Sequence, residues 1–278
     1  MVAKIIDGKE LSKKILEDVK KKIQQNNQKP GLAIVLVGNN PASEIYVGLK
    51  EKKSKELGIN CERYDLDELI SEEELLNRVD ELNQKKDIHG IVVQLPLPQH
   101  INDELVVNSV LPHKDVDGFT PVNQGNLVND NNMLVPATAR ACIELIKSTG
   151  TEIKGKNAVI IGRSKIVGKP VFLLLLQENA TATICHSKTK NIAKHTKNAD
   201  ILIAACGVPK LVKKDMVKEG AIVIDVGINR TDEGIVGDVD YENVKEVAGH
   251  ITPVPGGVGP MTIALLLDNI LQAMELHK

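Results

Sequence analysis

Apolar residues in the first part of the chain alternate between stripes of helical spacing and short continuous runs. Residues 7–25 carry apolar side chains every four positions from Leu11 to Ile23, which indicates one face of an amphipathic helix. The runs GLAIVLVG (31–38) and GIVVQLPLP (90–98) have the length of buried strands, and CERYDL (61–66) predicts a shorter strand. With helical segments between these runs, the pattern predicts a parallel α/β sheet.

The two helical segments between these runs, residues 40–58 and 71–84, are marked by capping residues. Asn40 can cap the first helix, Pro41 suits its first turn, and Gly58 can end it. The second begins at Ser71, and Glu74 three positions later completes the pattern of a capping box.

A second series of strand-length runs starts near residue 157. The short runs NAVIIG, ATATIC, ADILIAACG and AIVIDVG are mostly apolar, and they predict parallel strands buried on both faces. The segment 112–138 between the two series is rich in Asn, Pro, Gly and Asp, and it predicts an inter-domain connection, followed by a helix at 139–150. We therefore predict two α/β domains with parallel sheets around a cleft.

Length, charge and cysteine content argue against several classes of protein. The chain has 278 residues, enough for two ordinary domains, and its formal net charge of −2 argues against a nucleic-acid-binding protein. Its four cysteines form no CxxC pair, so we expect reduced thiols in the cytoplasm rather than a zinc site or disulfides. The start has no apolar stretch long enough for a signal peptide, and VFLLLLQE (171–178) is too short to cross a membrane.

The stretch GRSKIVGKP, from Gly162 to Pro170, follows a predicted strand and precedes an apolar helix. Its glycine spacing is one residue too long for a Walker A loop, and Pro170 stands where a magnesium-binding hydroxyl is needed. A dinucleotide turn fits better, with Gly168 allowing close backbone approach and the pyrophosphate at the helix N-terminus. An ordinary tight turn is the alternative.

The residues after the next strand bear on which dinucleotide would bind. An NAD-binding fold usually has an acidic residue about twenty positions after the turn. Here the sequence is His186, Ser187 and Lys188, and Arg163 lies in the turn itself. Cations and a hydroxyl suit a 2′-phosphate, so the sequence favours NADP, although a solvated strand end would explain His186 or Lys188 alone.

The segment TPVPGGVGPMT (252–262) combines glycines and prolines before the last helix. Such a loop favours close backbone approach to a ligand, here the nicotinamide end of the cofactor, over a purely structural turn.

Candidate catalytic residues lie in the first half of the chain. Tyr46 and Lys50 are four apart on a predicted helix and share a face, and a lysine among like charges (Lys52, Lys53 and Lys55) can serve as acid and base. The alternative is a solvent-facing lysine. Gln94 follows a buried strand, at the sheet edge where ligands of open α/β sheets bind. Asp115 and Asp117 can cap a helix or accept N–H groups from a heterocycle, and without a third ligand a metal site is disfavoured.

These stretches together resemble the bifunctional methylenetetrahydrofolate dehydrogenase/cyclohydrolase (FolD) family. The matching pieces include YVGLKEKKSKELGI, GIVVQLPLPQHI, PHKDVDGFTPVNQGNL, IIGRSKIVGKP, ATATICHSKTKN, VIDVGIN, GDVD and TPVPGGVGPMT, in the family's order over nearly the whole chain. The chain departs at residues 136–139, where PATA replaces the common P-C-T-P, so we expect an altered helix start there.

The resemblance implies a homodimer, a folate-binding catalytic domain at 1–119 and a Rossmann-like NADP-binding domain at 120–278. We expect the last helix, about 262–278, to pack back on the first domain. The resemblance also implies site residues. Lys50 is the acid/base, Gln94 hydrogen-bonds it, Asp117 binds the pterin and Tyr46 stacks on the folate rings. The implied substrate contacts further include Pro255 and Gly256, and the implied cofactor residues are Gly162, Arg163, Ser164, Ile166, Val167, Gly168, His186, Ser187 and Ile228.

The activity that the resemblance implies has two steps. NADP takes a hydride from 5,10-methylenetetrahydrofolate, and water then converts the methenyl product to 10-formyltetrahydrofolate, with one lysine moving both protons. Two alternatives stay open at this point. They are a dehydrogenase with weak or absent cyclohydrolase activity and a non-catalytic dinucleotide-sensing module.

Overall fold

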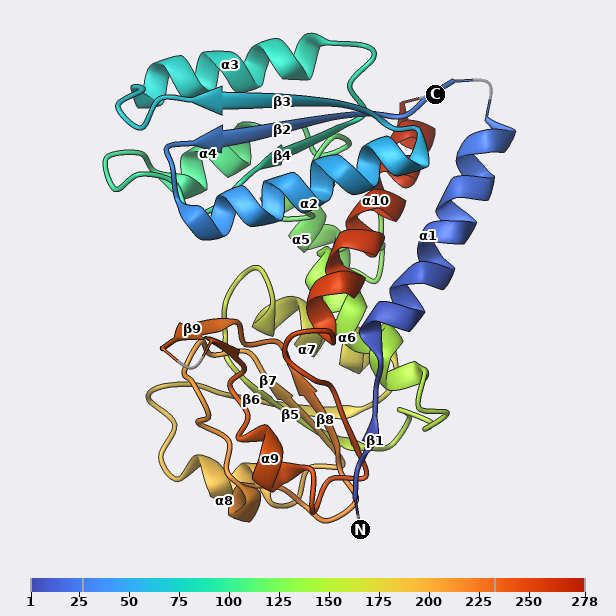
Figure 1. The fold of residues 1–278 in the computed structure, drawn as a ribbon, viewed down its shortest axis with the longest axis vertical. Coiled ribbons are helices and arrows are strands. Elements are labelled where there is room, and N and C mark those ends of the chain that lie inside the picture. Colours follow the sequence, from blue (N-terminus) through green and yellow to red (C-terminus); the bar gives the residue numbers. More distant parts are fainter. Residues whose placement is uncertain (1, 27, 233, 278) are drawn as a thin grey trace. The chain divides into compact units, whose positions relative to one another are not determined.

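A computed structural model describes residues 2–26, 28–232 and 234–277 (Figure 1). The chain divides into two compact units. Unit 1 comprises residues 1–13 and 138–262, and unit 2 comprises residues 14–137 and 263–278. The helices α1 (Gly8–Gln25) and α10 (Val258–Leu276) each contribute residues to both units. The predicted functional boundary at residues 119 and 120, and the predicted cleft, stay predictions.

Unit 2 is built on a three-stranded parallel sheet in the order β3-β2-β4. Its central strand β2 (Gly31–Val37) is buried at every position, between β3 (Asn60–Leu66) and β4 (Gly90–Val93). Helix α2 (Pro41–Leu57) lies on one side of this sheet and α3 (Glu72–Gln84) on the other (Figure 1). Alternate β2 side chains (Ala33, Val35 and Val37) pack against α3, and those between them are buried as well, so burial of both faces accounts for the unbroken apolar run in the sequence.

The predicted helix ends are confirmed. The Asn40 side chain accepts hydrogen bonds from the backbone N–H groups of Ala42 and Ser43, and Gly58 ends α2 in the left-handed conformation with φ of +84°. Ser71 and Glu74 form a capping box at the start of α3. These local signals act within one turn of the chain, which makes them visible in sequence.

Two expectations for this half of the chain need correction. The strand expected over 90–98 is only the four residues of β4, so Gln94 lies just after it. The segment 112–138, expected to be a connection, contains the helix α5 (Pro121–Val128). Another helix, α4 (Asp103–Ser109), lies just before this segment. Both are short helices, and both begin at a side-chain cap, Thr120 and Asn102 respectively. The helix α6 (Ala137–Lys147) starts directly after Pro136, so the PATA sequence still allows a helix start.

Unit 1 contains a six-stranded parallel sheet in the order β1-β11-β8-β7-β5-β6. The four predicted runs form its centre and one edge: β5 (Asn157–Ile161), β6 (Thr181–Cys185), β7 (Ile201–Ala204) and β8 (Ile222–Asp225). The sequence did not predict β1 (Lys4–Ile5), β11 (His250–Ile251) as a paired strand, or the antiparallel pair β9 (Asn229–Thr231) and β10 (Gly234–Val236). The remaining short elements are α7 (Gly168–Gln177), α8 (Ile192–Thr196), α9 (Tyr241–Val244) and a 3₁₀ turn at Lys214–Met216.

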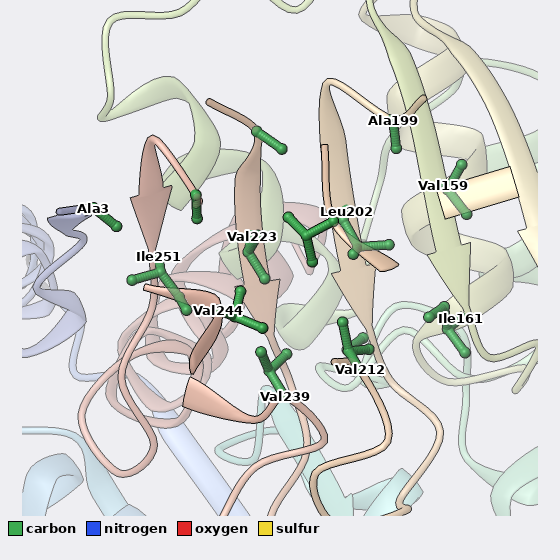
Figure 2. Close-up of a cluster of buried hydrophobic side chains, with 14 of the residues drawn as sticks. Ala3, Val159, Ile161, Ala199, Leu202, Val212, Val223, Val239, Val244 and Ile251 are labelled. Carbon is green, nitrogen blue, oxygen red and sulfur yellow. The ribbon is translucent and has the colours of Figure 1, made fainter. Parts of the chain in front are cut away.

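One hydrophobic core cluster of unit 1 consists mainly of valine, alanine, isoleucine and leucine side chains (Figure 2). Val159, Leu202 and Val223 project from neighbouring strands of the sheet, and Val239 and Val244 pack against them from the later chain. The strand order reverses at β5, since β6 lies on one side of it and β7 on the other. A doubly wound sheet binds its ligand at such a reversal, beyond the carboxyl ends of the strands. The predicted α/β class with parallel sheets is confirmed.

No helix of the described residues is long and apolar enough to span a lipid bilayer.

Three histidines gather at one end of unit 2. The ring of His277 makes edge contacts with those of His113 and His89, at centroid separations of 4.5 and 5.3 Å. Its Nε2 is buried and has no hydrogen-bond partner within the described residues. Burial, together with the positive charges of His113, Lys114 and His89, lowers the pKa of His277 to about 4.

We expect this cluster to make unit 2 less stable in mild acid. The pKa of His277 lies below the unfolded value of about 6.5, so the unfolded chain binds more protons between these values and stability falls as the pH falls from about 6.5 towards 4. At pH 5 the free energy of unfolding of the variant His277→Leu should exceed that of the native chain by on the order of 1 kcal/mol, since solvent screening weakens the effect of the charges. At pH 7 the two should differ little. Urea unfolding at the two pH values measures this, and an equal effect at both would contradict it.

Candidate functional site

Lys50 lies on the buried face of α2. The buried positions of this helix include Val47, Lys50, Ser54 and Leu57, which follow helical spacing, and Lys50 is only 9% exposed. The Ser54 hydroxyl donates to the Lys50 carbonyl at 2.8 Å, within the same face. The alternative of a solvent-facing lysine is therefore wrong for this residue. Tyr46, half-buried, lies one turn earlier on the same helix.

Gln94 holds the Lys50 side chain. The Lys50 Nζ donates a hydrogen bond to Gln94 Oε1 at 3.1 Å. The Gln94 Nε2 donates to the Leu95 carbonyl at 2.8 Å, and its backbone N–H donates to Val35 in the central strand. Because both ends of the amide are engaged, its oxygen is fixed towards the amine. The predicted contact between these two residues is thus present.

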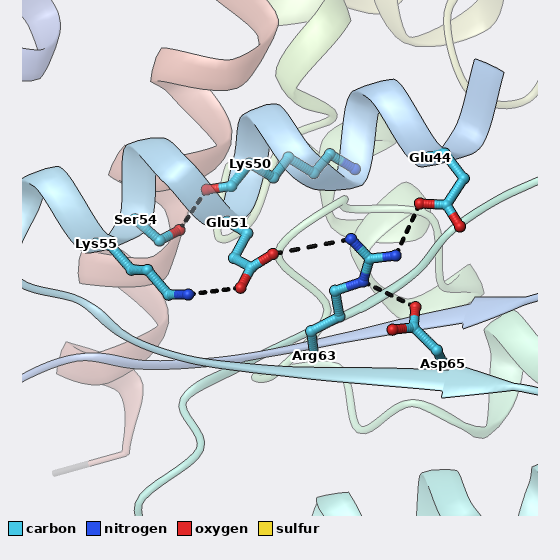
Figure 3. A network of polar contacts seen from close by, with 7 residues as sticks. All are labelled: Glu44, Lys50, Glu51, Ser54, Lys55, Arg63 and Asp65. Atoms are coloured by element: carbon cyan, nitrogen blue, oxygen red, sulfur yellow. Dashed lines mark hydrogen bonds and ion pairs between the residues drawn. The ribbon is translucent and has the colours of Figure 1, made fainter. Parts of the chain in front are cut away.

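Two of the three lysines near Lys50 are paired with glutamates. Lys53 pairs with Glu56 and Lys55 with Glu51, each at 2.6 Å on the outer surface of α2. Figure 3 shows the Lys50 amine extending towards the start of the helix, without a contact to the ion pairs that join Arg63 of β3 to α2. The expected crowding of like charge is therefore partly offset, by a glutamate at Lys53 and another at Lys55.

Asp115 and Asp117 have different surroundings. The Asp115 carboxylate accepts hydrogen bonds from Thr120 N–H at 2.8 Å and from Asn123 Nδ2 at 2.9 Å, so it organises the start of α5. Asp117 is half-buried, and burial raises its pKa to about 6 although the positive charge of Lys50 opposes that rise. Asp117 thus lies within range of the charge of the buried lysine, whereas Asp115 binds the start of α5.

A residue that sequence reasoning missed fixes the chain next to Asp117. Asn269 of α10 is fully buried, and its Nδ2 donates to the carbonyls of Val116 and Val135 at 2.8 and 2.9 Å. Gly118, with φ of +72°, turns the chain immediately after the aspartate. The only available signal was a polar residue inside the apolar sequence ALLLDNILQAM, which is a weak indication of a buried hydrogen-bonding role.

In unit 1, the turn after β5 has the form of an anion cradle. A Cβ on Gly162 would lie 2.1 Å from the Ala205 carbonyl oxygen, and one on Gly168 would lie 2.3 Å from that of Gly162, so neither position admits a side chain without movement. The Ser164 hydroxyl accepts the N–H groups of Val167 and Gly168 at 3.1 and 3.3 Å. Helix α7 begins at Gly168, with Pro170 in its first turn, so its N-terminus opens onto this turn.

The side chains around this turn suit an anionic ligand. Arg163 and Ile166 are exposed in the turn itself, and Ser187 is exposed after β6. The His186 Nδ1 accepts the N–H of Lys188 at 3.1 Å, which leaves the ring partly covered at the strand end. No carboxylate occupies the five positions after β6, from His186 to Lys190. The residues present therefore fit a dinucleotide that carries a 2′-phosphate.

The remaining predicted residues lie in two further loops of unit 1. Ile228 follows β8 and is exposed. Pro255 is exposed before Gly256, whose φ of +116° lies in the region that favours glycine. The structure thus brings Lys50, Gln94 and Asp117 together in unit 2, and it sets the predicted cofactor residues at strand ends of unit 1.

Comparison with known proteins assigns both halves of the chain. Residues 6–117 match the family model described as tetrahydrofolate dehydrogenase/cyclohydrolase, catalytic domain. Residues 136–278 match the NAD(P)-binding domain of the same family.

Individual relatives agree over the full length. The bifunctional protein FolD of Listeria innocua is 55% identical over 278 residues, which is 99% of this chain and 98% of that protein. The crystal structure of the bifunctional enzyme FolD from Campylobacter jejuni is 47% identical, with a TM-score of 0.96 over 99% of this chain and all of that one. The Trypanosoma brucei enzyme, solved with NADP cofactor and inhibitor, is 38% identical, with a TM-score of 0.95 over 99% of this chain and 98% of that one. On this evidence the chain belongs to the tetrahydrofolate dehydrogenase/cyclohydrolase family.

Proposed function

We propose that this chain oxidises 5,10-methylenetetrahydrofolate with NADP and hydrolyses the resulting methenyl group to give 10-formyltetrahydrofolate. The observation that carries the proposal is the buried Lys50 amine, fixed by Gln94 and coupled to Asp117, within the part of the chain that matches the family's catalytic domain. A full-length relative named bifunctional supports both activities.

The first step removes a hydride from the one-carbon bridge of the folate. NADP, when bound, supplies the acceptor for this hydride. The nitrogen beside the bridge carbon donates electron density as the hydride leaves, so the step needs no proton transfer and yields a cationic methenyl carbon. What this chain contributes is positioning of the folate, and we assign that to Asp117 and Tyr46. An ionised Asp117 can accept N–H groups of the pterin.

The second step needs two proton movements at one place. Water attacks the methenyl carbon through its oxygen and gives up one proton. The carbon–nitrogen bond to the ring nitrogen then breaks as that nitrogen gains a proton, and the hydroxyl of the adduct loses its own proton to become the formyl carbonyl on the other nitrogen. A single amine can accept the first proton and deliver one to the ring nitrogen, while the hydroxyl proton leaves to water as the one proton that the hydrolysis releases; Lys50 is the group we assign to these two transfers. Gln94 keeps that amine in one orientation by accepting one of its hydrogens.

Separate assays of the two steps test the proposal. The purified chain should reduce NADP when given 5,10-methylenetetrahydrofolate, followed by nicotinamide absorbance, and it should hydrolyse methenyltetrahydrofolate without any nucleotide. NADP binding without turnover of either folate would support the sensing module instead. Oxidation without hydrolysis would support the narrower dehydrogenase.

Arg163 provides a test of cofactor choice. Removing its guanidinium in Arg163→Ala should raise the KM for NADP about 10- to 100-fold, because a charge-assisted contact to the 2′-phosphate is lost. The KM for NAD should stay unchanged, since NAD has no phosphate there. An equal rise for both nucleotides would contradict a role in recognising the 2′-phosphate.

We also propose that the chain acts as a cytoplasmic homodimer, as its family resemblance implies. Light scattering at micromolar concentration tests the dimer.

A further inference from the structure

Two buried carboxylates lie at the carboxyl ends of β7 and β8. Asp225 is the last residue of β8 and is 3% exposed, while Asp238 follows β10 and is fully buried. The two residues are adjacent, since the Asp238 N–H donates to Asp225 Oδ1 at 2.9 Å. Burial raises the pKa of Asp225 to about 7; the negative charge of Asp238 adds to that rise, and hydrogen bonds from backbone N–H groups oppose it. Neither is in an ion pair within the described part of the chain.

Each carboxylate binds the backbone of a different loop. The Oδ2 of Asp238 accepts the N–H groups of Cys206 and Gly207 at 2.7 and 2.9 Å, and so holds the loop that follows β7. The Oδ1 of Asp225 accepts the N–H of Gly227 at 3.0 Å, and so holds the loop that follows β8.

The pair is itself anchored to the core of unit 1. Asp225 accepts the N–H groups of Asp238 and Val239, both at 2.9 Å, and the Val239 side chain packs among the buried valines of Figure 2. Glycines make room for the carboxylates. A Cβ on Gly237 would lie 1.8 Å from Asp225 Oδ2, and one on Gly227 would lie 2.3 Å from Asp238 Oδ1.

The position of these loops connects them to the nucleotide. The loop after β7 touches the phosphate turn, because the Ala205 carbonyl is the group that excludes a side chain at Gly162. In a doubly wound sheet the dinucleotide crosses the strand reversal, with one nucleoside on each side. The turn and β6 lie on the side assigned above to the 2′-phosphate, so the loops after β7 and β8 lie on the nicotinamide side.

Buried carboxylates without cations are costly, because burial removes their hydration. That cost favours a specific task over general stabilisation of the core. We propose that Asp225 and Asp238 are positioning residues, a carboxylate pair that holds the two loops on the nicotinamide side of the cofactor site in the conformation that binds the nucleotide. The inference rests on the proposed function only in the identity of the nucleotide.

The hydrogen bonds predict unequal effects for similar substitutions. Both oxygens of Asp225 accept backbone N–H groups, so the amide of Asp225→Asn must point its own N–H₂ at one of them. Asp238 differs, because its Oδ1 accepts from the Asn229 side chain at 2.9 Å. In Asp238→Asn, the Asn229 amide can turn and accept instead, which spares the two loop N–H groups. Asp238→Ala removes every acceptor.

The test measures NADP binding and methenyltetrahydrofolate hydrolysis on the same variants. We expect Asp225→Asn and Asp238→Ala to weaken the Kd for NADP by about tenfold or more, as stranded buried donors would. Asp238→Asn should recover most of the affinity lost in Asp238→Ala. Hydrolysis should stay near the native rate in all three, since it uses Lys50 of unit 2. Asp240→Asn, which alters an aspartate bonded to Lys213 and Asn243, is the matched control and should leave the Kd unchanged.

Two results would overturn the inference. One is native NADP affinity in both Asp225→Asn and Asp238→Ala. The other is parallel loss of NADP binding and hydrolysis with no recovery in Asp238→Asn, which would make the pair a support of the fold alone. The nucleotide titration contains no folate, so failure of the proposed folate reaction in the native chain would leave this result interpretable.

Discussion

Replacing Lys50 by methionine should abolish methenyltetrahydrofolate hydrolysis while leaving NADP binding intact. Methionine keeps most of the length and apolar contacts of the buried side chain but carries no proton. A positioned acid/base contributes about 10²- to 10⁴-fold to a rate, so hydrolysis should fall by at least about a hundredfold. The Kd for NADP should not change, since Lys50 and the phosphate turn belong to different compact units.

Lys53→Met is the matched control for this experiment. It makes the same chemical change three residues along α2, at an exposed amine paired with Glu56. Surface pairs of this kind contribute little, so both activities and the thermal midpoint should stay near native values. Hydrolysis by Lys50→Met at the native rate, or equal losses in the two variants, would remove Lys50 from the mechanism.

The elements that sequence predicted well depend on short-range signals. The central strand β2 is apolar at every position because both of its faces are covered, and the caps at Asn40 and Ser71 act within a single turn. The strand β1 was missed because two residues, Lys4 and Ile5, carry no periodicity. Its pairing with β11 joins positions about 250 residues apart, and nothing local in the sequence encodes that contact.

In the candidate site, too, local features could be predicted from the sequence and contacts between distant residues could not. Periodicity placed Tyr46 and Lys50 on one face of a helix, but the sequence alone did not distinguish a buried lysine from an exposed one. Burial of Lys50 depends on packing of the whole helix, and its contact with Gln94 spans 44 positions. Asp225 and Asp238 were missed as a pair because each lies in a motif, VIDVGIN or GDVD, that shows no chemistry until the fold brings them together.

Gly162→Ala tests the most restrictive position of the phosphate turn. The backbone there has φ of +132°, which side chains rarely adopt, and the added methyl carbon would lie 2.1 Å from the Ala205 carbonyl oxygen. Both obstacles are backbone, so no flexible side chain can move aside. Backbone strain and overpacking together should destabilise unit 1 by about 2–5 kcal/mol, and displacement of the turn should remove measurable NADP binding.

Gly155→Ala separates strain from the clash. Gly155 precedes the same strand with φ of +73°, and nothing lies within 4 Å of the position that its Cβ would take. It should cost about 1–2 kcal/mol for the left-handed conformation alone and should bind NADP like the native chain. Guanidinium unfolding together with nucleotide titration compares the two. If Gly162→Ala unfolded at the same denaturant concentration as Gly155→Ala and kept native affinity, the turn would tolerate a side chain, and close backbone approach at Gly162 would not be what forms the cradle.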